Sequence, residues 1–216
     1  MSCRPTELCA GRCYAHDALD AAPPSLIRGA INSVIAQQFE QGDASQKAEI
    51  MQQLAPHTRR AIRAAEKEAE ALRSTDWLRR PFIRFSHVGE IAAFPDFANK
   101  LAAQVCDLSG GGVDCVIYTR HPNAKKLCSK LLIINFTLDQ SSYDRKEWSP
   151  PSARIVFSAF NGEIDPDVDI NFLEHHRWSH FPPIGTGQIC PATHPEASER
   201  TCDAVRCSLC FQRPVK

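Results

Sequence analysis

Four cysteines lie close together near the C-terminal end of the sequence, with the spacing Cys-x11-Cys-x4-Cys-x2-Cys; they are Cys190, Cys202, Cys207 and Cys210. Thiolates at this density can hold a zinc ion or an iron–sulfur cluster, or can pair as disulfides. The gaps are irregular for a zinc ribbon, which usually has two Cys-x2-Cys pairs. We therefore expect a closed [4Fe–4S] cluster. Structural zinc, or one metal shared between the two ends of the chain, is the alternative.

A second group of cysteines, Cys3, Cys9 and Cys13, lies at the other end of the sequence with the spacing Cys-x5-Cys-x3-Cys. Three thiolates without a nearby fourth suit a [4Fe–4S] cluster in which one iron keeps an open position. An open iron can bind a small molecule, whereas four-thiolate ligation is closed. The alternative is that two of these three thiolates join the C-terminal cysteines in a zinc site.

Composition and charge narrow the class of protein. The 216 residues carry 25 Lys and Arg against 25 Asp and Glu, so the net charge does not indicate a nucleic-acid partner. No apolar stretch reaches the roughly 18–20 residues of a membrane span. The N-terminal residues lack the apolar segment of a secretory signal peptide, so we expect a cytoplasmic protein without a membrane partner. Reducing conditions there disfavour structural disulfides, which favours metal ligation by the cysteines.

The middle of the chain must position these groups, and its apolar residues repeat at helical or strand spacing. A helix begins near Ser25 and ends at Gly42, and a second begins near Ser45, is interrupted by Pro56 and resumes over residues 57–73. Further helices are predicted over residues 94–105 and 123–128. Near-continuous apolar runs predict strands at residues 82–87, 113–118, 131–136 and 154–157, with a short strand at 187–189.

Strands that alternate with helices indicate βαβ units and a parallel sheet. We predict an α/β fold in the form of a partial, open β/α barrel of about four to six mostly parallel strands. Residues 1–216 form a single domain. Within it, residues 1–24 are an N-terminal cysteine loop, 25–186 hold the helices and the barrel, and 187–216 are a C-terminal cysteine segment.

Polar residues follow the predicted strands at the points where the strands end. They are Gly89, Glu90, Arg120, Asp139 and Ser158, with Cys190 after the last short strand. The carboxyl ends of parallel strands meet at one edge of a sheet, where α/β proteins bind their ligands. The sequence therefore predicts a binding site at this edge. For each residue alone, an ordinary hydrogen-bonded polar group at a strand end is the alternative.

Five motifs occur in a fixed order along the chain: Cys9-x3-Cys13-Tyr14-Ala15, Arg84-Phe85-Ser86-His87-Val88-Gly89-Glu90, Tyr118-Thr119-Arg120, Cys190-Pro191-Ala192-Thr193 and Cys202-x4-Cys207-x2-Cys210-Phe211. Together they resemble the phage gene product 88 family of phage and bacterial proteins, whose biochemistry is largely unassigned. The resemblance covers nearly the whole chain. It indicates relatives rather than an activity.

A more distant resemblance is to the radical S-adenosylmethionine (SAM) enzymes. These enzymes have a partial barrel, a three-cysteine loop whose open iron binds SAM, and a Gly-Gly-Glu-type motif that holds the methionine amine. Val88-Gly89-Glu90 corresponds to that motif, and Cys3, Cys9 and Cys13 correspond to the loop. The loop spacing differs from the Cys-x3-Cys-x2-Cys of that family. Several members also carry an auxiliary cluster on C-terminal cysteines, as residues 190–210 would here.

The radical-SAM resemblance implies an iron–sulfur enzyme that binds and cleaves SAM and takes electrons from a donor such as a flavodoxin or a ferredoxin. Glu90 would pair with the ammonium group of SAM, and Arg120 would bind a carboxylate with two hydrogen bonds. Asp139 and Ser158 would bind further groups of SAM or of a small-molecule or peptide substrate. The alternative is a zinc-stabilised binding module for nucleic acid or a protein partner, in which nucleic acid would contact Arg59, Arg60, Arg63, Arg79 and Arg80.

Overall fold

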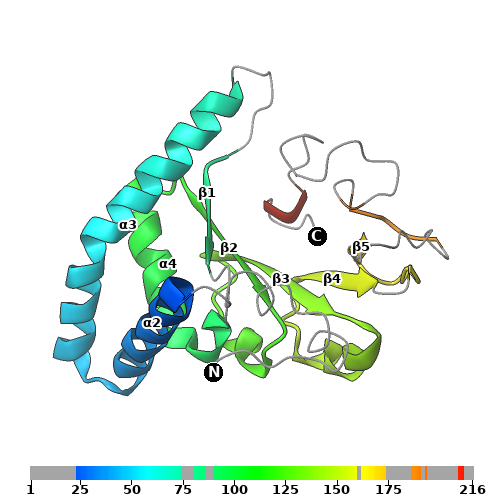
Figure 1. The fold of residues 1–216 in the computed structure, drawn as a ribbon, viewed down its shortest axis with the longest axis horizontal. Coiled ribbons are helices and arrows are strands. Elements are labelled where there is room, and N and C mark those ends of the chain that lie inside the picture. The colour runs from blue at the N-terminus through cyan, green and yellow to red at the C-terminus, as the bar shows by residue number, and fades with distance from the viewer. Residues whose placement is uncertain are drawn as a thin grey trace.

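A five-stranded, all-parallel sheet forms the centre of the protein in its computed structural model (Figure 1). The structure describes residues 23–73, 80–85, 90–159, 162–173, 186–190, 193 and 209–211. The strands are β1 (Phe82–Phe85), β2 (Asp114–Thr119), β3 (Leu132–Leu138), β4 (Arg154–Ala159) and β5 (Ile170–Leu173). Their spatial order, β1-β2-β3-β4-β5, follows the order of the sequence. The predicted α/β class and parallel sheet are confirmed.

Helices connect the strands and cover one face of the sheet. The α-helices are α2 (Pro23–Gln41), α3 (Ala44–Arg73) and α4 (Pro95–Ser109), which lie together on one side of β1 in Figure 1. Shorter 3-10 helices are η2 (Ile91–Ala93), η3 (Pro122–Lys126), η4 (Gln140–Trp148) and η6 (Leu209–Phe211). The chain passes from β1 to β2 through η2 and α4, from β2 to β3 through η3, and from β3 to β4 through η4.

The face of the sheet that packs on α4 holds the main hydrophobic core. Alternate residues of β2 and β3, such as Ile117, Ile134 and Phe136, belong to one buried cluster with Ala102 and Val105 of α4. Because side chains alternate across a strand, the residues between them point to the opposite side of the sheet. We call that opposite side the second face.

The second face is partly polar and is contacted by the C-terminal part of the chain. Phe211 of η6 stacks on Phe82 of β1 with ring centroids 4.0 Å apart. Cys190 and Cys210 are both buried in one cluster with Ile170 of β5. In Figure 1, β1 lies between the helical layer and η6. Cys190, Cys210 and Phe211 therefore pack against the side of the sheet that the long helices leave uncovered.

The prediction that Pro56 interrupts the second helix is wrong, because α3 continues through it. A proline inside a helix removes one backbone hydrogen bond. Side chains bond two carbonyl groups that precede Pro56 in α3: Gln104 of α4 donates to the Met51 carbonyl at 2.8 Å, and Thr58 donates to the Leu54 carbonyl at 3.1 Å. Burial of Met51 further fixes this part of α3 against its neighbours.

Four of the predicted strands are confirmed, with small shifts at their ends, as β1 to β4. The predicted strand at residues 187–189 is instead a single bridge between Ile189 and Asn171. The partner of that bridge belongs to β5, a strand that the sequence pattern does not predict. No helix in the described ranges combines the length and the apolar character needed to cross a membrane.

Candidate functional site

Three of the predicted site residues meet at the carboxyl ends of β1, β2 and β3. Nη1 of Arg120 lies 3.2 Å from Oδ2 of Asp139. The backbone N–H of Arg120 donates to Oε2 of Glu90 at 3.4 Å. We call Glu90, Arg120 and Asp139 the strand-end cluster. The parallel order of the strands brings them together although they lie far apart in the sequence.

Asp139 is the most deeply buried member of the strand-end cluster, with 0% of its surface exposed. Its Oδ1 accepts hydrogen bonds from the backbone N–H of Ser141 at 2.9 Å and from the hydroxyl groups of Ser141 and Ser142 at 2.8 and 3.0 Å. Its Oδ2 faces Arg120. One oxygen therefore caps η4, and the other holds the guanidinium of Arg120 in place.

Glu90 is buried, with 6% of its surface exposed. Burial raises the pKa of this carboxyl above its ordinary value of 4.5, because the charged form loses its hydration. Hydrogen bonds from the Thr119 side chain and from the backbone N–H groups of Arg120 and Ala92, together with the charge of Arg120, oppose that shift. Glu90 is thus a carboxylate whose ionised form is held mainly by neutral donors, and an additional cation would stabilise it.

The raised pKa of Glu90 predicts how stability depends on pH. The folded state holds the Glu90 proton more tightly than the unfolded state does. The stability that this proton contributes is therefore fully present below about pH 4.5 and is lost as the pH rises through the raised pKa of Glu90. Glu90→Gln cannot ionise and does not show this loss. We therefore expect the free energy of unfolding of E90Q, relative to wild type, to increase between about pH 4.5 and pH 7.

Urea unfolding at several pH values measures this difference, with Glu147→Gln, at an exposed position on η4, as the matched control. A difference between E90Q and wild type that stays constant over this pH range would contradict the assignment.

His121 lies beside the strand-end cluster and is not among the predicted site residues. It is buried, and its Nδ1 accepts a hydrogen bond from the backbone N–H of Asn123 at 3.2 Å. This bond leaves the proton of the neutral ring on Nε2. The His121 backbone N–H donates to the hydroxyl of Thr119 at 3.0 Å. The signal in the sequence is a polar run, Thr119-Arg120-His121, directly after an apolar strand, of which the predicted site includes only Arg120.

Ser158 lies apart from the strand-end cluster. It is buried on β4 and pairs in register with Phe172 of β5, which places it on the second face. Within the part of the chain that the structure describes, no hydrogen bond joins Ser158 to Glu90, Arg120 or Asp139. A ligand that contacts both would have to extend from the cluster across the carboxyl end of β4.

Two buried polar residues of the second face are also absent from the predicted site. Asn135 of β3 is fully buried, and its Nδ2 donates to the backbone carbonyl of Cys210 at 3.0 Å. Its Oδ1 accepts from Nη1 of Arg154 on β4 at 3.1 Å. An amide inside the apolar run Ile133-Ile134-Asn135-Phe136 is the available signal. These bonds attach the C-terminal segment to the centre of the sheet.

The structure brings together two of the predicted metal ligands. Cys190 and Cys210 are buried in the cluster with Ile170, and the partly buried rings of Tyr118, Phe172 and Phe211 pack against it. The other predicted ligands, Cys3, Cys9, Cys13, Cys202 and Cys207, lie outside the described residues, as does Gly89. Among the residues that are described, no three or more His, Cys, Asp or Glu side chains are grouped so as to hold a metal ion.

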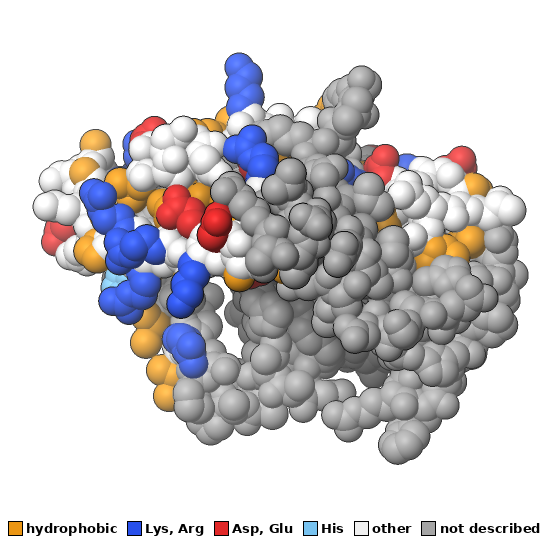
Figure 2. Space-filling view, turned by 90° about the horizontal axis from the view of Figure 1, so that it is seen from above, with side chains coloured by type: hydrophobic (Ala, Val, Ile, Leu, Met, Phe, Trp, Pro, Cys, Tyr) orange, Lys and Arg blue, Asp and Glu red, His pale blue; other side chains and the backbone are white. Residues whose placement is uncertain are grey.

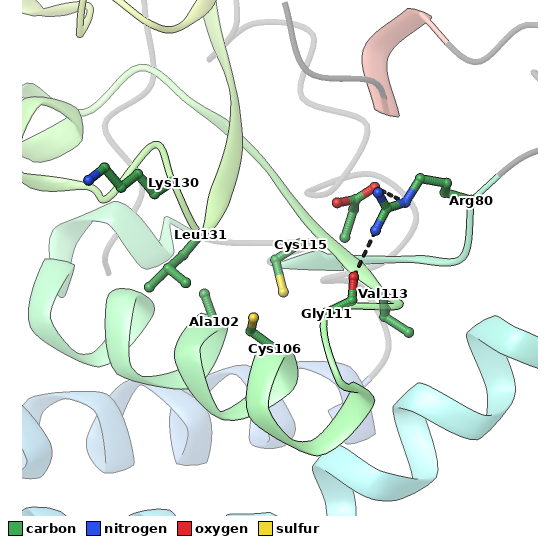
Figure 3. Close-up of a pocket in the computed structure, with 9 residues that line it drawn as sticks. Arg80, Ala102, Cys106, Gly111, Val113, Cys115, Lys130 and Leu131 are labelled. Carbon is green, nitrogen blue, oxygen red and sulfur yellow. Dashed lines mark hydrogen bonds and ion pairs between the residues drawn. The ribbon is translucent and has the colours of Figure 1, made fainter.

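A cavity of about 200 Å³ lies at the opposite edge of the sheet from the strand-end cluster (Figure 3). It is lined by Arg80, Ala102, Cys106, Gly111, Val113, Asp114, Cys115, Lys130 and Leu131. Arg80 closes one side of it, with Nε 3.1 Å from the Asp114 carboxylate and Nη2 donating to the Gly111 carbonyl at 2.8 Å. The cavity is formed by the amino ends of strands, so it is separate from the predicted site.

Three further cysteines, Cys106, Cys115 and Cys128, lie in the middle of the chain, and only Cys115 is buried. Cys115 belongs to the core on β2, whereas Cys106 and Cys128 are half-buried. Cys106 lies in the last turn of α4, and Cys128 lies in the turn after η3.

Comparisons of the chain with protein-family models, with curated proteins and with solved structures found no match.

Proposed function

We propose that this chain is an iron–sulfur enzyme that binds and cleaves SAM, related to radical-SAM enzymes and to the phage gene product 88 proteins. The observation that carries the proposal is the strand-end cluster of Glu90, Arg120 and Asp139 at the carboxyl edge of a parallel sheet. Cys190 and Cys210 lie on the second face of the same sheet. The proposed SAM site and two of the proposed thiol ligands thus belong to the same sheet.

We further propose that the sheet is an open β/α barrel and that the second face is its interior. Its strands follow one another in sequence order, β1-β2-β3-β4-β5. A doubly wound sheet instead reverses its strand order at a switch point. The buried polar residues Asn135 and Arg154 on the second face also suit the interior of a barrel that holds a polar ligand.

The roles of the cluster residues follow from their contacts. The ionised Glu90 carboxylate binds the ammonium group of SAM, and that cation lowers the raised pKa of Glu90. Arg120 binds a carboxylate through its guanidinium, which Asp139 orients. Asp139 acts mainly as a positioning residue, because Ser141, Ser142 and Arg120 contact its oxygens. Ser158 borders the substrate.

The thiols fit the proposed cofactor. Cys190 and Cys210 are buried among aromatic and aliphatic side chains, which limits access of water to sulfur ligands. With Cys202 and Cys207 they would hold the closed auxiliary [4Fe–4S] cluster, and Cys3, Cys9 and Cys13 would hold the cluster with the open iron. The clusters supply electron transfer when bound, with a flavodoxin or a ferredoxin as donor. The protein supplies binding, orientation and exclusion of water.

A zinc-stabilised binding module is the second candidate, and a basic surface on α3 favours it. Arg59, Arg60 and Arg63 are exposed on that helix. Figure 2 shows Lys and Arg side chains gathered at the end of the molecule where α3 lies, on the left of the view. Arg80 is engaged by Asp114 instead, and Arg79 lies outside the described residues. Salt-sensitive nucleic-acid binding that is lost in an R59A/R60A/R63A variant would support this candidate.

The proposed function predicts that protein reconstituted with iron and sulfide under anaerobic conditions, then reduced with dithionite, converts SAM to methionine and 5′-deoxyadenosine. Glu90→Ala removes a charged hydrogen-bond partner of the ammonium group, so we expect SAM to bind about 10- to 100-fold more weakly. Glu147→Ala, an exposed position, is the matched control. Mass spectrometry of the products and calorimetric titration of SAM make the measurement.

Iron-loaded wild-type protein that neither binds nor cleaves SAM would contradict the proposal. If E90A and wild type bind SAM with equal strength, the protein binds SAM but Glu90 does not bind its ammonium group.

A further inference from the structure

Two thiols face each other across the cavity at the amino edge of the sheet. Cys106 lies in α4 and Cys115 lies in β2, and both line this cavity. Figure 3 shows their side chains pointing toward one another. Neither cysteine forms a disulfide in this structure. They belong to neither of the two cysteine groups at the ends of the chain.

The turn between α4 and β2 holds these two cysteines opposite each other. α4 ends at Gly110, which has a positive φ of 59°, and Gly111 follows with a φ of 75°. The Gly111 backbone N–H donates to the Cys106 carbonyl at 2.8 Å, so the chain reverses at the end of the helical turn that begins at Cys106. The strand that begins at Asp114 then runs back along α4. The opposition of the thiols is therefore a property of the backbone and not of a flexible loop.

We propose that Cys106 and Cys115 are a redox-active pair that forms a reversible disulfide between α4 and β2. Cys106 is half-buried, so its thiolate attacks a small-molecule disulfide such as oxidised glutathione and forms a mixed disulfide, releasing one small thiol. Cys115 has 2% of its surface exposed and resolves that intermediate by attacking the Cys106 sulfur. The second small thiol then leaves. In total, two protein thiols are oxidised to one disulfide, and one disulfide of the reagent is reduced to two thiols.

This pair is independent of the proposed SAM site. The strand-end cluster lies at the carboxyl ends of the strands, whereas the cavity between the thiols lies at their amino ends. The bond would fix the last turn of α4 to the second residue of β2. Both elements contribute to the main core, so the crosslink would join two parts of the fold that are already packed. In a reducing compartment such a bond is transient and reports the local redox state.

Tryptic mapping tests the pair directly, because one peptide contains both cysteines. Cleavage after Lys100 and Arg120 releases residues 101–120, which hold Cys106 and Cys115 and no other cysteine. Folded full-length protein is treated with oxidised glutathione, alkylated and digested. We expect this peptide to resist alkylation and to be two hydrogen atoms lighter than the reduced form. After dithiothreitol it should carry two alkyl groups.

Two single variants and a comparison of folded with unfolded protein test the pair further. In Cys106→Ser and Cys115→Ser, the remaining cysteine should instead be alkylated or carry one glutathione. The bond should form at least about tenfold faster in folded protein than in protein unfolded by urea, because the fold holds the two thiols together. A wild-type peptide that keeps two alkylatable thiols, or a bond that forms only in urea, would overturn the proposal. A crosslink from either thiol to Cys128 would do the same.

Discussion

Replacement of Cys210 by alanine is expected to remove about half of the iron from anaerobically purified protein. Two filled [4Fe–4S] clusters hold about eight irons in each chain, and loss of one of four ligands would empty the closed C-terminal cluster. Cys210 is buried with Cys190 on the second face, and the Asn135 side chain binds its backbone carbonyl. The variant should therefore keep this backbone contact while losing the ligand.

Iron and zinc analysis together with electron paramagnetic resonance spectra of the reduced protein make this measurement. Cys128→Ala is the matched control, because Cys128 is half-buried and belongs to neither terminal group of cysteines. The control should hold as much iron as wild type. Colourless wild-type protein with stoichiometric zinc would overturn the iron–sulfur proposal and favour the binding module. Full iron content in C210A would exclude Cys210 as a ligand.

Replacement of Arg120 by leucine is expected to lower the free energy of unfolding by about 3–5 kcal/mol. The change leaves the carboxylate of Asp139, which has 0% of its surface exposed, without the guanidinium 3.2 Å from its Oδ2. Removing one partner of a buried ion pair is costly because the remaining charge has lost its hydration and its counterion. The backbone N–H of Arg120 still reaches Glu90, but Glu90 also loses the charge of Arg120, so a further variant must isolate the pair with Asp139.

Urea unfolding of two further variants separates this effect from lost packing. In the double variant R120L/D139N the buried charge is absent, so it should be more stable than R120L by at least about 1 kcal/mol. The side-chain amide introduced by D139N keeps one oxygen, which can still accept the hydrogen bonds at the N-terminus of η4. Arg59→Leu, at an exposed site on α3, should change stability by no more than about 0.5 kcal/mol. Equal stability of R120L and R120L/D139N would show that the ion pair is not the cause.

The strands and the residues at their ends could be predicted because burial on both faces leaves a local signal. A strand such as Leu132–Leu138 is a nearly unbroken apolar run, and the first polar residue after it marks the edge of the sheet. Parallel order then brings Glu90, Arg120 and Asp139 together without further information. Their mutual contacts, and the capping role of Asp139, depend on distances that no local pattern contains.

Features that depend on contacts distant in sequence could not be predicted. β5 is only four residues long, Ile170–Leu173, and it exists because the edge of β4 offers hydrogen bonds to it. α3 continues through Pro56 in a region where Gln104, which lies on another helix, bonds the Met51 carbonyl, and this contact has no local signal in the sequence. Asn135 interrupts the apolar run of β3, and its role depends on hydrogen bonds to Cys210 and Arg154, which lie far from it in sequence.

The attachment of Cys210 to Asn135 bears on how the chain folds. Each strand of the sheet pairs with the strand before it in sequence, so most of the sheet assembles by closing short loops. The hydrogen bond from Asn135 to the Cys210 carbonyl instead joins residues 75 positions apart. Closing this longer loop costs more entropy than closing the loop between two neighbouring strands. We therefore expect the C-terminal contact to form after the sheet, so that Cys190 and Cys210 meet on strands that are already paired.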